Sequence, residues 1–137
     1  MGDRANIYLE LPTGYAPDSP KGGVYLYTHW NGSEWPERLR EALAFGANRW
    51  TDDQYLARII TSRVFADLVD GEMGGGLSLA LGDNSHPIIV VEVADQTVSF
   101  ADEDDETDRD KRYGRVSFAE YVAQVRASYP ARAPHLT

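Results

Sequence analysis

The stretch GGVYLYTHWNGSEWP, residues 22–36, contains a predicted strand, a turn and the start of a helix. Successive side chains of a strand point to opposite faces, so the strand over residues 24–30 presents two different surfaces. One surface carries Val24, Leu26 and Trp30, and the other carries Tyr25, Tyr27 and His29. We expect the aliphatic surface, together with Trp30, to pack into the core.

A turn and a first helix follow this strand. Asn31 and Gly32 supply backbone freedom for the turn. Ser33 is a predicted helix N-cap, and Pro36 is compatible with the first helical turn. Apolar residues then recur at helical spacing, at Leu39, Ala42, Leu43, Gly46 and Trp50.

The clearest helical pattern covers residues 51–72. Thr51 and Asp52 are candidate N-caps, and the glycines of residues 73–76 end the pattern. One stripe of this helix is apolar and is predicted to face a sheet; it consists of Leu56, Ile60, Val64 and Leu68.

Strands are predicted on both sides of the two helices. Residues 5–11 alternate between apolar and polar side chains, which is typical of a half-buried strand. Residues 12–23 are rich in proline and glycine and are expected to form a loop. Three further strands are predicted at 77–81, 88–94 and 97–101, the last two joined by a tight turn.

The last third of the chain combines charge with one more helix. Residues 102–114 read as a charged loop, and residues 130–137 as a flexible tail. Between them, a helix over 117–129 begins with Ser117 and carries Glu120 three positions later, which is the pattern of a capping box.

The order of elements is therefore ββααβββα, which predicts an α+β fold. We expect a mostly antiparallel sheet of about five strands, with helices packed mainly on one face. Residues 1–137 are expected to form a single domain, since this length suffices for one hydrophobic core.

The second face of such a sheet normally meets solvent and is polar. Here residues 88–93 are apolar on both faces, and Tyr25, Tyr27 and His29 lie on the open one. We therefore expect a second subunit, a ligand or the 12–23 loop to cover this face. The alternative is an ordinary exposed surface, since strands favour aromatic residues without any function.

Composition excludes several classes of function. The net charge of −9 opposes binding to a nucleic-acid polymer, because that affinity comes largely from cationic side chains. The chain has no cysteine, which excludes disulfides and thiol catalysis. The sequence has no apolar run long enough for a membrane span and no pattern of a signal peptide. A cytoplasmic location is expected.

Sequence motifs give no support for catalysis, for a metal site or for a cofactor. The three histidines are His29, His86 and His135, and only His29 lies on a regular element. No nucleophile, zinc or phosphate-loop motif occurs. The acidic run at 102–113 lacks the glycine and the final glutamate of a calcium loop. No catalytic residue, metal ligand or cofactor is therefore predicted.

Arginines provide a possible anion site. Arg4 precedes the first strand and Arg58 lies within the second predicted helix. Together with His29 they would form a clamp for a phosphate or a carboxylate; ion pairs with the many acidic residues are the alternative. The full set of candidate ligand-binding residues is Arg4, Tyr25, Tyr27, His29, Asn31 and Arg58.

Four segments, GDRANI, VYLYTHWNG, YLARII and GGLSLAL, form a further pattern between about residues 2 and 82. This pattern resembles that of a family of small bacterial and phage-encoded proteins. The matching residues are Gly2, Arg4, Ala5, His29, Trp30, Asn31, Gly32, Tyr55, Ala57, Arg58, Gly75 and Gly76. The resemblance implies a phage or prophage origin, where small proteins act against host defences in the host cytoplasm, and it implies no particular activity.

Three functions remain open at this point. The first is a non-enzymatic, oligomeric binding module that sequesters a small, nucleotide-like anion. The second is an acidic protein that inhibits a host protein by direct contact, and the third is a small hydrolase that uses His29. Ligand stabilisation, salt-sensitive protein binding and substrate turnover distinguish the three.

Overall fold

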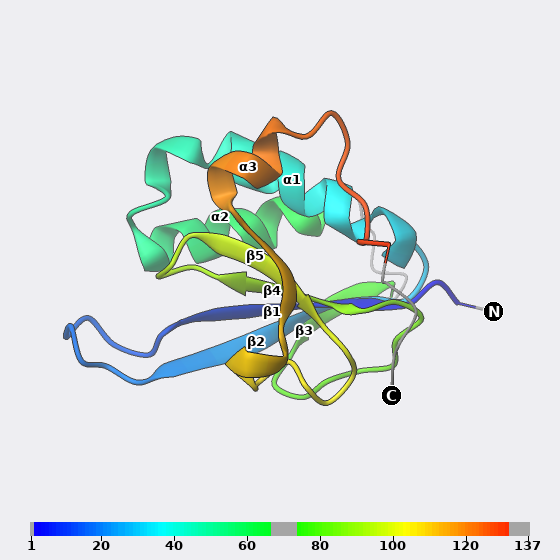
Figure 1. The fold of residues 1–137 in the computed structure, drawn as a ribbon, viewed down its shortest axis with the longest axis horizontal. Helices are drawn as coiled ribbons and strands as arrows, with labels where there is room; N and C mark the ends of the chain where they lie inside the picture. Colours follow the sequence, from blue (N-terminus) through cyan, green and yellow to red (C-terminus); the bar gives the residue numbers. More distant parts are fainter. Residues whose placement is uncertain (1, 67–73, 132–137) are drawn as a thin grey trace.

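The fold is a six-stranded sheet covered on one side by three helices (Figure 1). The computed structural model describes residues 2–66 and 74–131. The strands are β1 (Ala5–Pro12), β2 (Lys21–Thr28), β3 (Gly75–Ser78), β4 (Ile88–Glu92), β5 (Thr97–Ala101) and β6 (Tyr113–Ser117). The helices are α1 (Trp35–Phe45), α2 (Asp53–Val64) and α3 (Phe118–Ala123), with short 3-10 turns at Gly32–Glu34, Ala47–Arg49 and Arg109–Lys111.

The strand order across the sheet is β3-β2-β1-β4-β5-β6. All neighbouring strands are antiparallel except β1 and β4, which run parallel with Ile7 opposite Ile89. The segment between β3 and β4 produces this parallel pair, because it carries the chain from the β3 edge past β2 and β1 to β4, whereas α1 and α2 connect the antiparallel neighbours β2 and β3. The predicted α+β class and the mostly antiparallel sheet are therefore confirmed.

The sheet has one strand more than expected. The additional strand is β6, whose residues were predicted to belong to a charged loop and to the start of a helix. Its sequence YGRVS has too little apolar alternation to be recognised as a strand. β6 pairs with β5 through Val116 and Val98, and the pairing is irregular between Val98 and Phe100. Gly114 has a φ of 66°, a conformation that glycine adopts without strain.

The main core lies between the sheet and the helices. From the sheet, Ile7, Leu9 and Leu26 point into this layer and are almost completely buried. The predicted stripe of α2 packs against them, since Leu56, Ile60 and Val64 are fully buried. The fourth predicted member, Leu68, lies outside the described residues.

The helix starts agree with the sequence in two cases out of three. Asp52 caps α2 by accepting a hydrogen bond from the Tyr55 amide, and Ser117 and Glu120 form the predicted capping box of α3. Ser33, in contrast, does not cap α1, because it lies in a 3-10 turn and its amide donates to the Asp3 carboxylate at 2.9 Å.

The predicted helix over 117–129 is too long. α3 ends at Ala123, Gln124 has an extended backbone conformation, and residues 124–126 form a bend. The amide of Ala127 donates to the Glu37 carboxylate at 2.8 Å, which holds this segment against α1. Residues 132–137 of the predicted tail lie outside the described residues.

The prediction that Trp30 fills the core is wrong. β2 ends at Thr28, so the strand alternation no longer applies at position 30, and the Trp30 side chain is 58% exposed. Trp35 takes the core position instead. It is fully buried, and its indole N–H donates to the carbonyl of Leu26 at 3.2 Å.

The second face of the sheet is covered by the chain's own loops, and not by the 12–23 segment. Residues 79–87 are held there by Asn6, whose side-chain amide donates to the carbonyl of Asp83 and to the side chain of Asn84. Residues 102–112 are held by Arg112, whose guanidinium donates to the carbonyl of Glu106. A small second core forms beneath these loops, from Tyr8, Tyr25, Ile88, Val90 and Ala101.

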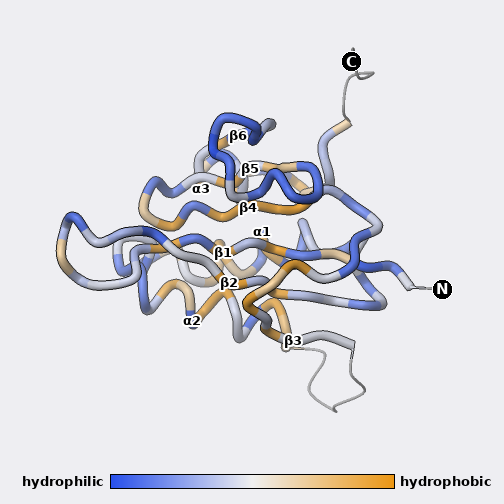
Figure 2. Tube along the Cα trace, turned by 90° about the horizontal axis from the view of Figure 1, so that it is seen from below, coloured by the Kyte–Doolittle hydropathy of each residue, from blue (hydrophilic) through white to orange (hydrophobic). Residues whose placement is uncertain are grey.

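The two edges of the sheet differ in character. Hydrophobic residues lie along the β3 edge and its continuation, whereas a hydrophilic loop lies beside β6 (Figure 2). Leu77 and Leu79 at the β3 edge are 58% and 83% exposed. Among the helices that the structure describes, none is long and apolar enough to cross a membrane.

Candidate functional site

Three of the six predicted site residues come together where β2 ends. The hydroxyl of Tyr27 lies 2.9 Å from Nδ1 of His29, and Nε of Arg4 lies 3.4 Å from the same nitrogen. A guanidinium only donates hydrogen bonds, so Nδ1 acts as the acceptor in this arrangement. The ring proton of His29 is then on Nε2, where it can be donated to another group.

Backbone hydrogen bonds fix this cluster from both sides. The amide of Arg4 donates to the Ser85 hydroxyl at 3.2 Å, and the Ser85 amide donates to the carbonyl of Arg4 at 2.8 Å. The amide of Asp3 donates to the carbonyl of His29 at 2.8 Å, and the His29 amide donates to the carbonyl of Gly74 at 2.7 Å. The side chains of Arg4 and His29 therefore start from well-anchored positions.

A groove of about 430 Å³ lies beside this cluster, and Tyr27 belongs to both. Much of its surface is backbone, because several residues of β3 and of the following loop are small. The Tyr27 ring packs closely on Gly82, since a Cβ at that position would lie 3.0 Å from a ring carbon. The lining residues are Tyr27, Gly75, Gly76, Leu77, Ser78, Ala80 and Gly82.

The charge of Arg4 is not neutralised locally. Within residues 2–66 and 74–131, no carboxylate forms an ion pair with Arg4. Arg112 shows the contrast, because its buried guanidinium pairs with Glu10 at 3.0 Å and with Glu92 at 3.2 Å. Arg4 is thus a half-buried cation near the groove, and a guanidinium of this kind can donate charge-assisted hydrogen bonds to an anion.

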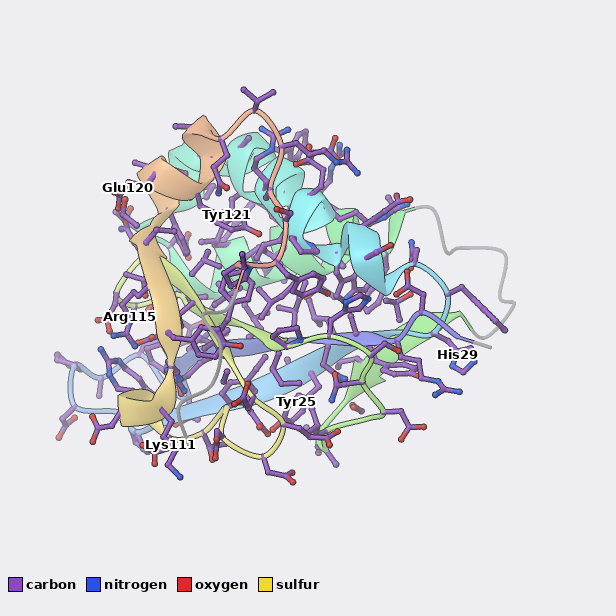
Figure 3. All side chains as sticks on the ribbon, turned by 45° about the vertical axis from the view of Figure 1, so that its right-hand side comes forward. Tyr25, His29, Lys111, Arg115, Glu120 and Tyr121 are labelled. Atoms are coloured by element: carbon purple, nitrogen blue, oxygen red, sulfur yellow. The ribbon has the colours of Figure 1, made fainter. Side chains whose placement is uncertain are left out.

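Tyr25 is on the same face of the sheet but has a structural environment. Its hydroxyl donates to the Glu106 carboxylate at 2.6 Å, and its ring packs on that of Tyr8 at 5.0 Å. Burial raises the pKa of Tyr25, and the Glu106 carboxylate raises it further. In Figure 3, Tyr25 lies beneath the sheet and His29 lies at one end of it, whereas Tyr121 lies above the sheet in the helical layer.

Asn31 and Arg58 do not join the cluster. The Asn31 side chain accepts a short hydrogen bond from the Thr28 hydroxyl, which stabilises the turn after β2. Arg58 belongs to α2, on the other side of the sheet, where its guanidinium lies 5.2 Å from the centre of the Tyr55 ring. The expected clamp of Arg4 and Arg58 around His29 is therefore not formed, because the sheet separates the two arginines.

A second polar pair was not predicted from the sequence. Nε2 of His86 lies 2.5 Å from the Asp3 carboxylate, and the His86 ring stacks on Tyr129 at 4.5 Å. Burial acts to raise the pKa of Asp3, but hydrogen bonds from His86 and Ser33 outweigh it and hold that pKa below its ordinary value. Asp3 and His86 are 83 positions apart, so only the sheet brings them together.

Hydrolysis through His29 would need a nucleophile held beside its ring. In the described part of the chain, no serine or threonine hydroxyl forms a hydrogen bond with His29, so a histidine-activated nucleophile is not assembled there. The same residues contain no cluster of acidic and histidine side chains that would hold a metal ion. What the arrangement can do is bind an anion next to a shallow apolar groove.

Comparisons with protein-family models, with curated proteins and with solved structures find no match to this chain. The resemblance to a phage-encoded family therefore stays a prediction.

Proposed function

We propose that this protein is a non-enzymatic binding module that sequesters a small, nucleotide-like anion. The position of Tyr27 carries the proposal. Its ring forms part of an apolar groove, while its hydroxyl contacts the His29 ring that Arg4 also approaches. A single ligand that combines a flat ring with an anionic group would use both parts of this surface.

The groove suits a flat ring. Gly75 and Gly76 leave the backbone of β3 uncovered, and a Cβ built at Gly76 would meet no atom within 4 Å. A planar ring can lie on such a bare strand, with the Tyr27 ring as its apolar neighbour. The binding free energy of the ring would come from burying these surfaces.

The anionic end would meet two donors. Arg4 presents guanidinium N–H groups, and His29 presents its Nε2 proton in the tautomer that its contacts favour. Charge-assisted hydrogen bonds of this kind are the stronger ones in proteins. In the part of the chain that the structure describes, neither Arg4 nor His29 forms an ion pair with a carboxylate that the ligand would first have to displace.

The binding module is proposed to be an oligomer. β3 ends the sheet, so its outer backbone groups have no strand partner among the described strands. Exposed edges of this kind pair readily with another strand. Antiparallel pairing of two β3 strands would give a symmetric dimer and would bring a second chain next to the groove.

Thermal stability with added ligand tests the module. AMP and inorganic phosphate are the two probes, because they separate the ring from the anion. We expect AMP to raise the melting temperature of the wild type and to be recovered intact after denaturation. Phosphate alone should have a smaller effect, because it does not fill the groove.

Variants locate the effect. R4Q and H29A should lose most of the AMP shift while their own melting temperatures stay within a few degrees of the wild type. R58Q is the matched control, since it removes the same charge on the other side of the sheet. Equal AMP shifts in R4Q and R58Q, or no shift in the wild type, contradict the proposed site. Conversion of AMP would instead support a hydrolase.

The acidic inhibitor of a host protein is the second candidate. One observation favours it: the 102–112 segment exposes the side chains of Glu103, Asp104, Asp108 and Asp110. Binding through such carboxylates would weaken strongly with added salt. The phage or prophage setting suggested by the sequence pattern fits both candidates, as does a host-cytoplasmic location.

A further inference from the structure

The outer surface of the helical layer carries two exposed aromatic rings, each covered by arginine. Phe45 at the end of α1 is 62% exposed, and Tyr55 in α2 is 39% exposed. The guanidinium of Arg63 lies 4.3 Å from the centre of the Phe45 ring. Arg49 and Arg58 lie 4.4 Å and 5.2 Å from the centre of the Tyr55 ring. We call these five residues the arginine–aromatic patch.

A hollow of about 370 Å³ lies within the patch. Phe45, Tyr55, Arg58 and Arg63 all line it, together with Ile59 and Ser62. Its lining is thus partly aromatic and aliphatic and includes two arginine side chains. A surface that combines aromatic residues and arginine has the composition of the energetically dominant centres of protein interfaces.

The charge of the patch is opposite to that of the whole protein. The chain has 13 basic and 22 acidic residues, for a net charge of −9. In residues 2–66 and 74–131, none of the three patch arginines forms an ion pair with a carboxylate. Elsewhere Arg40, Arg109, Arg112 and Arg115 all do. Despite the excess of acidic residues, the patch arginines are therefore not neutralised by carboxylates of the described residues.

An arginine that covers an aromatic ring can still bind a carboxylate. The guanidinium is planar, so its N–H groups point outward around its edge while its face rests on the ring. The ring also restricts the mobility of the long side chain, which lowers the entropy lost on binding. Arg58 and Arg63 are therefore held next to the hollow with donors available.

We propose that the arginine–aromatic patch docks a short acidic segment of a partner protein. One apolar side chain of the segment enters the hollow, and its flanking carboxylates bind Arg58 and Arg63. This surface lies on the other side of the sheet from the Tyr27 groove, and the proposal is independent of the ligand proposed for that groove.

A nucleic-acid strand fits the patch less well. Its affinity depends on neutralising many successive phosphates, and three arginines on one surface serve few of them. A strand that extends beyond the patch meets a protein of net charge −9. A short peptide segment ends before it leaves the patch, so it gains the local attraction without most of this repulsion.

The test is an array of labelled acidic peptides, each with one leucine or phenylalanine, scored by fluorescence anisotropy on the full-length protein. A matched array replaces every Asp and Glu with Asn and Gln. We expect a subset of acidic peptides to bind, and R58Q/R63Q to lower their affinity about tenfold or more. K111Q/R126Q is the control, because it removes two positive charges at exposed positions outside the patch.

Three outcomes overturn the proposal. In the first, no acidic peptide binds more tightly than its amide-matched partner. In the second, R58Q/R63Q and K111Q/R126Q weaken binding equally, which would mean that only net charge matters. In the third, a single-stranded oligonucleotide binds more tightly than every peptide and displaces them. F45S tests the apolar part of the patch separately from the arginines. It should weaken the binding of peptides that have an apolar anchor. The melting temperature of the F45S protein should stay near that of the wild type, because the Phe45 ring is mostly exposed.

Discussion

Tyr25 and Glu106 form a buried hydrogen bond of 2.6 Å across the face of the sheet that the helices leave open. Tyr25 belongs to β2, whereas Glu106 belongs to the 102–112 segment that covers this face. Arg112 donates to the backbone of the same segment and pairs with Glu10 on β1. The acidic segment is therefore part of the folded structure, although its sequence reads as a solvated loop.

The first prediction concerns this bond. Y25F removes the hydroxyl that donates to the buried Glu106 carboxylate. The other oxygen of this carboxylate already lacks a hydrogen-bond partner among the described residues. We expect a loss of about 1–3 kcal/mol in the free energy of unfolding, measured by urea denaturation. Y15F is the control, since Tyr15 is 92% exposed. An unchanged stability in Y25F would show that the 102–112 segment is not held by this bond.

The second prediction concerns alkaline pH. Burial raises the pKa of Tyr25, Tyr121 and Tyr129 above the ordinary tyrosine value. The unfolded chain loses these protons near a pH of about 10, while the native protein keeps them. The stability that these groups contribute is thus complete below this pH and decreases as the pH rises above it.

Urea denaturation over a series of alkaline pH values measures this decrease. Y121F should reduce the slope of stability against pH, because one group with a raised pKa has been removed. A stability that rises with pH in this range would contradict the assignment.

The third prediction concerns the main core. Ile60 is fully buried between α2 and the sheet, so I60A should cost about 2–5 kcal/mol of stability. V125A, at a side chain that is 97% exposed, should stay within about 0.5 kcal/mol of the wild type. Chemical denaturation measures both. A similarly small effect in I60A would mean that the α2 stripe does not face the sheet.

The fourth prediction distinguishes two tryptophans. W35A should cost about 3–5 kcal/mol, because the indole is fully buried and its N–H bonds to the Leu26 carbonyl. W30A should change the melting temperature little, since most of this side chain is exposed. A large loss of stability in W30A and a small loss in W35A would instead mean that Trp30 occupies the core, as strand alternation alone predicts.

The fifth prediction concerns self-association through β3. Light scattering at micromolar concentration should give a mass above the 15.3 kDa of the monomer. L77K/L79K should shift the protein toward the monomer, because charged residues on an exposed edge oppose strand pairing. A wild type that stays monomeric through the concentration series would remove the proposed dimer, while leaving the Tyr27 groove to be tested separately with AMP.

Much of the fold could be predicted because it depends on short-range patterns. The alternation in β1 and β2, the apolar run of β4 and the stripe of α2 each reflect the period of one element. The caps at Asp52 and Ser117 also depend on neighbours only three residues away. Local patterns of this kind were sufficient for the α+β class.

Part of the candidate site could be predicted for the same reason. Strand alternation assigned Tyr25, Tyr27 and His29 to one face, and the structure keeps Tyr27 and His29 in contact. The approach of Arg4 to His29 was expected. The prediction that Arg58 joins them was wrong, because the helical period of α2 does not reveal on which side of the sheet the helix packs.

The sequence by itself thus determined which segments are strands and helices and which residues share a face, since these properties follow from backbone geometry over a few residues. Only the tertiary structure decided what covers the second face, that Trp35 replaces Trp30 in the core, and that Asp3 meets His86. These features depend on contacts between residues far apart in the chain. Whether such residues meet is set by strand order and register, which no local pattern contains.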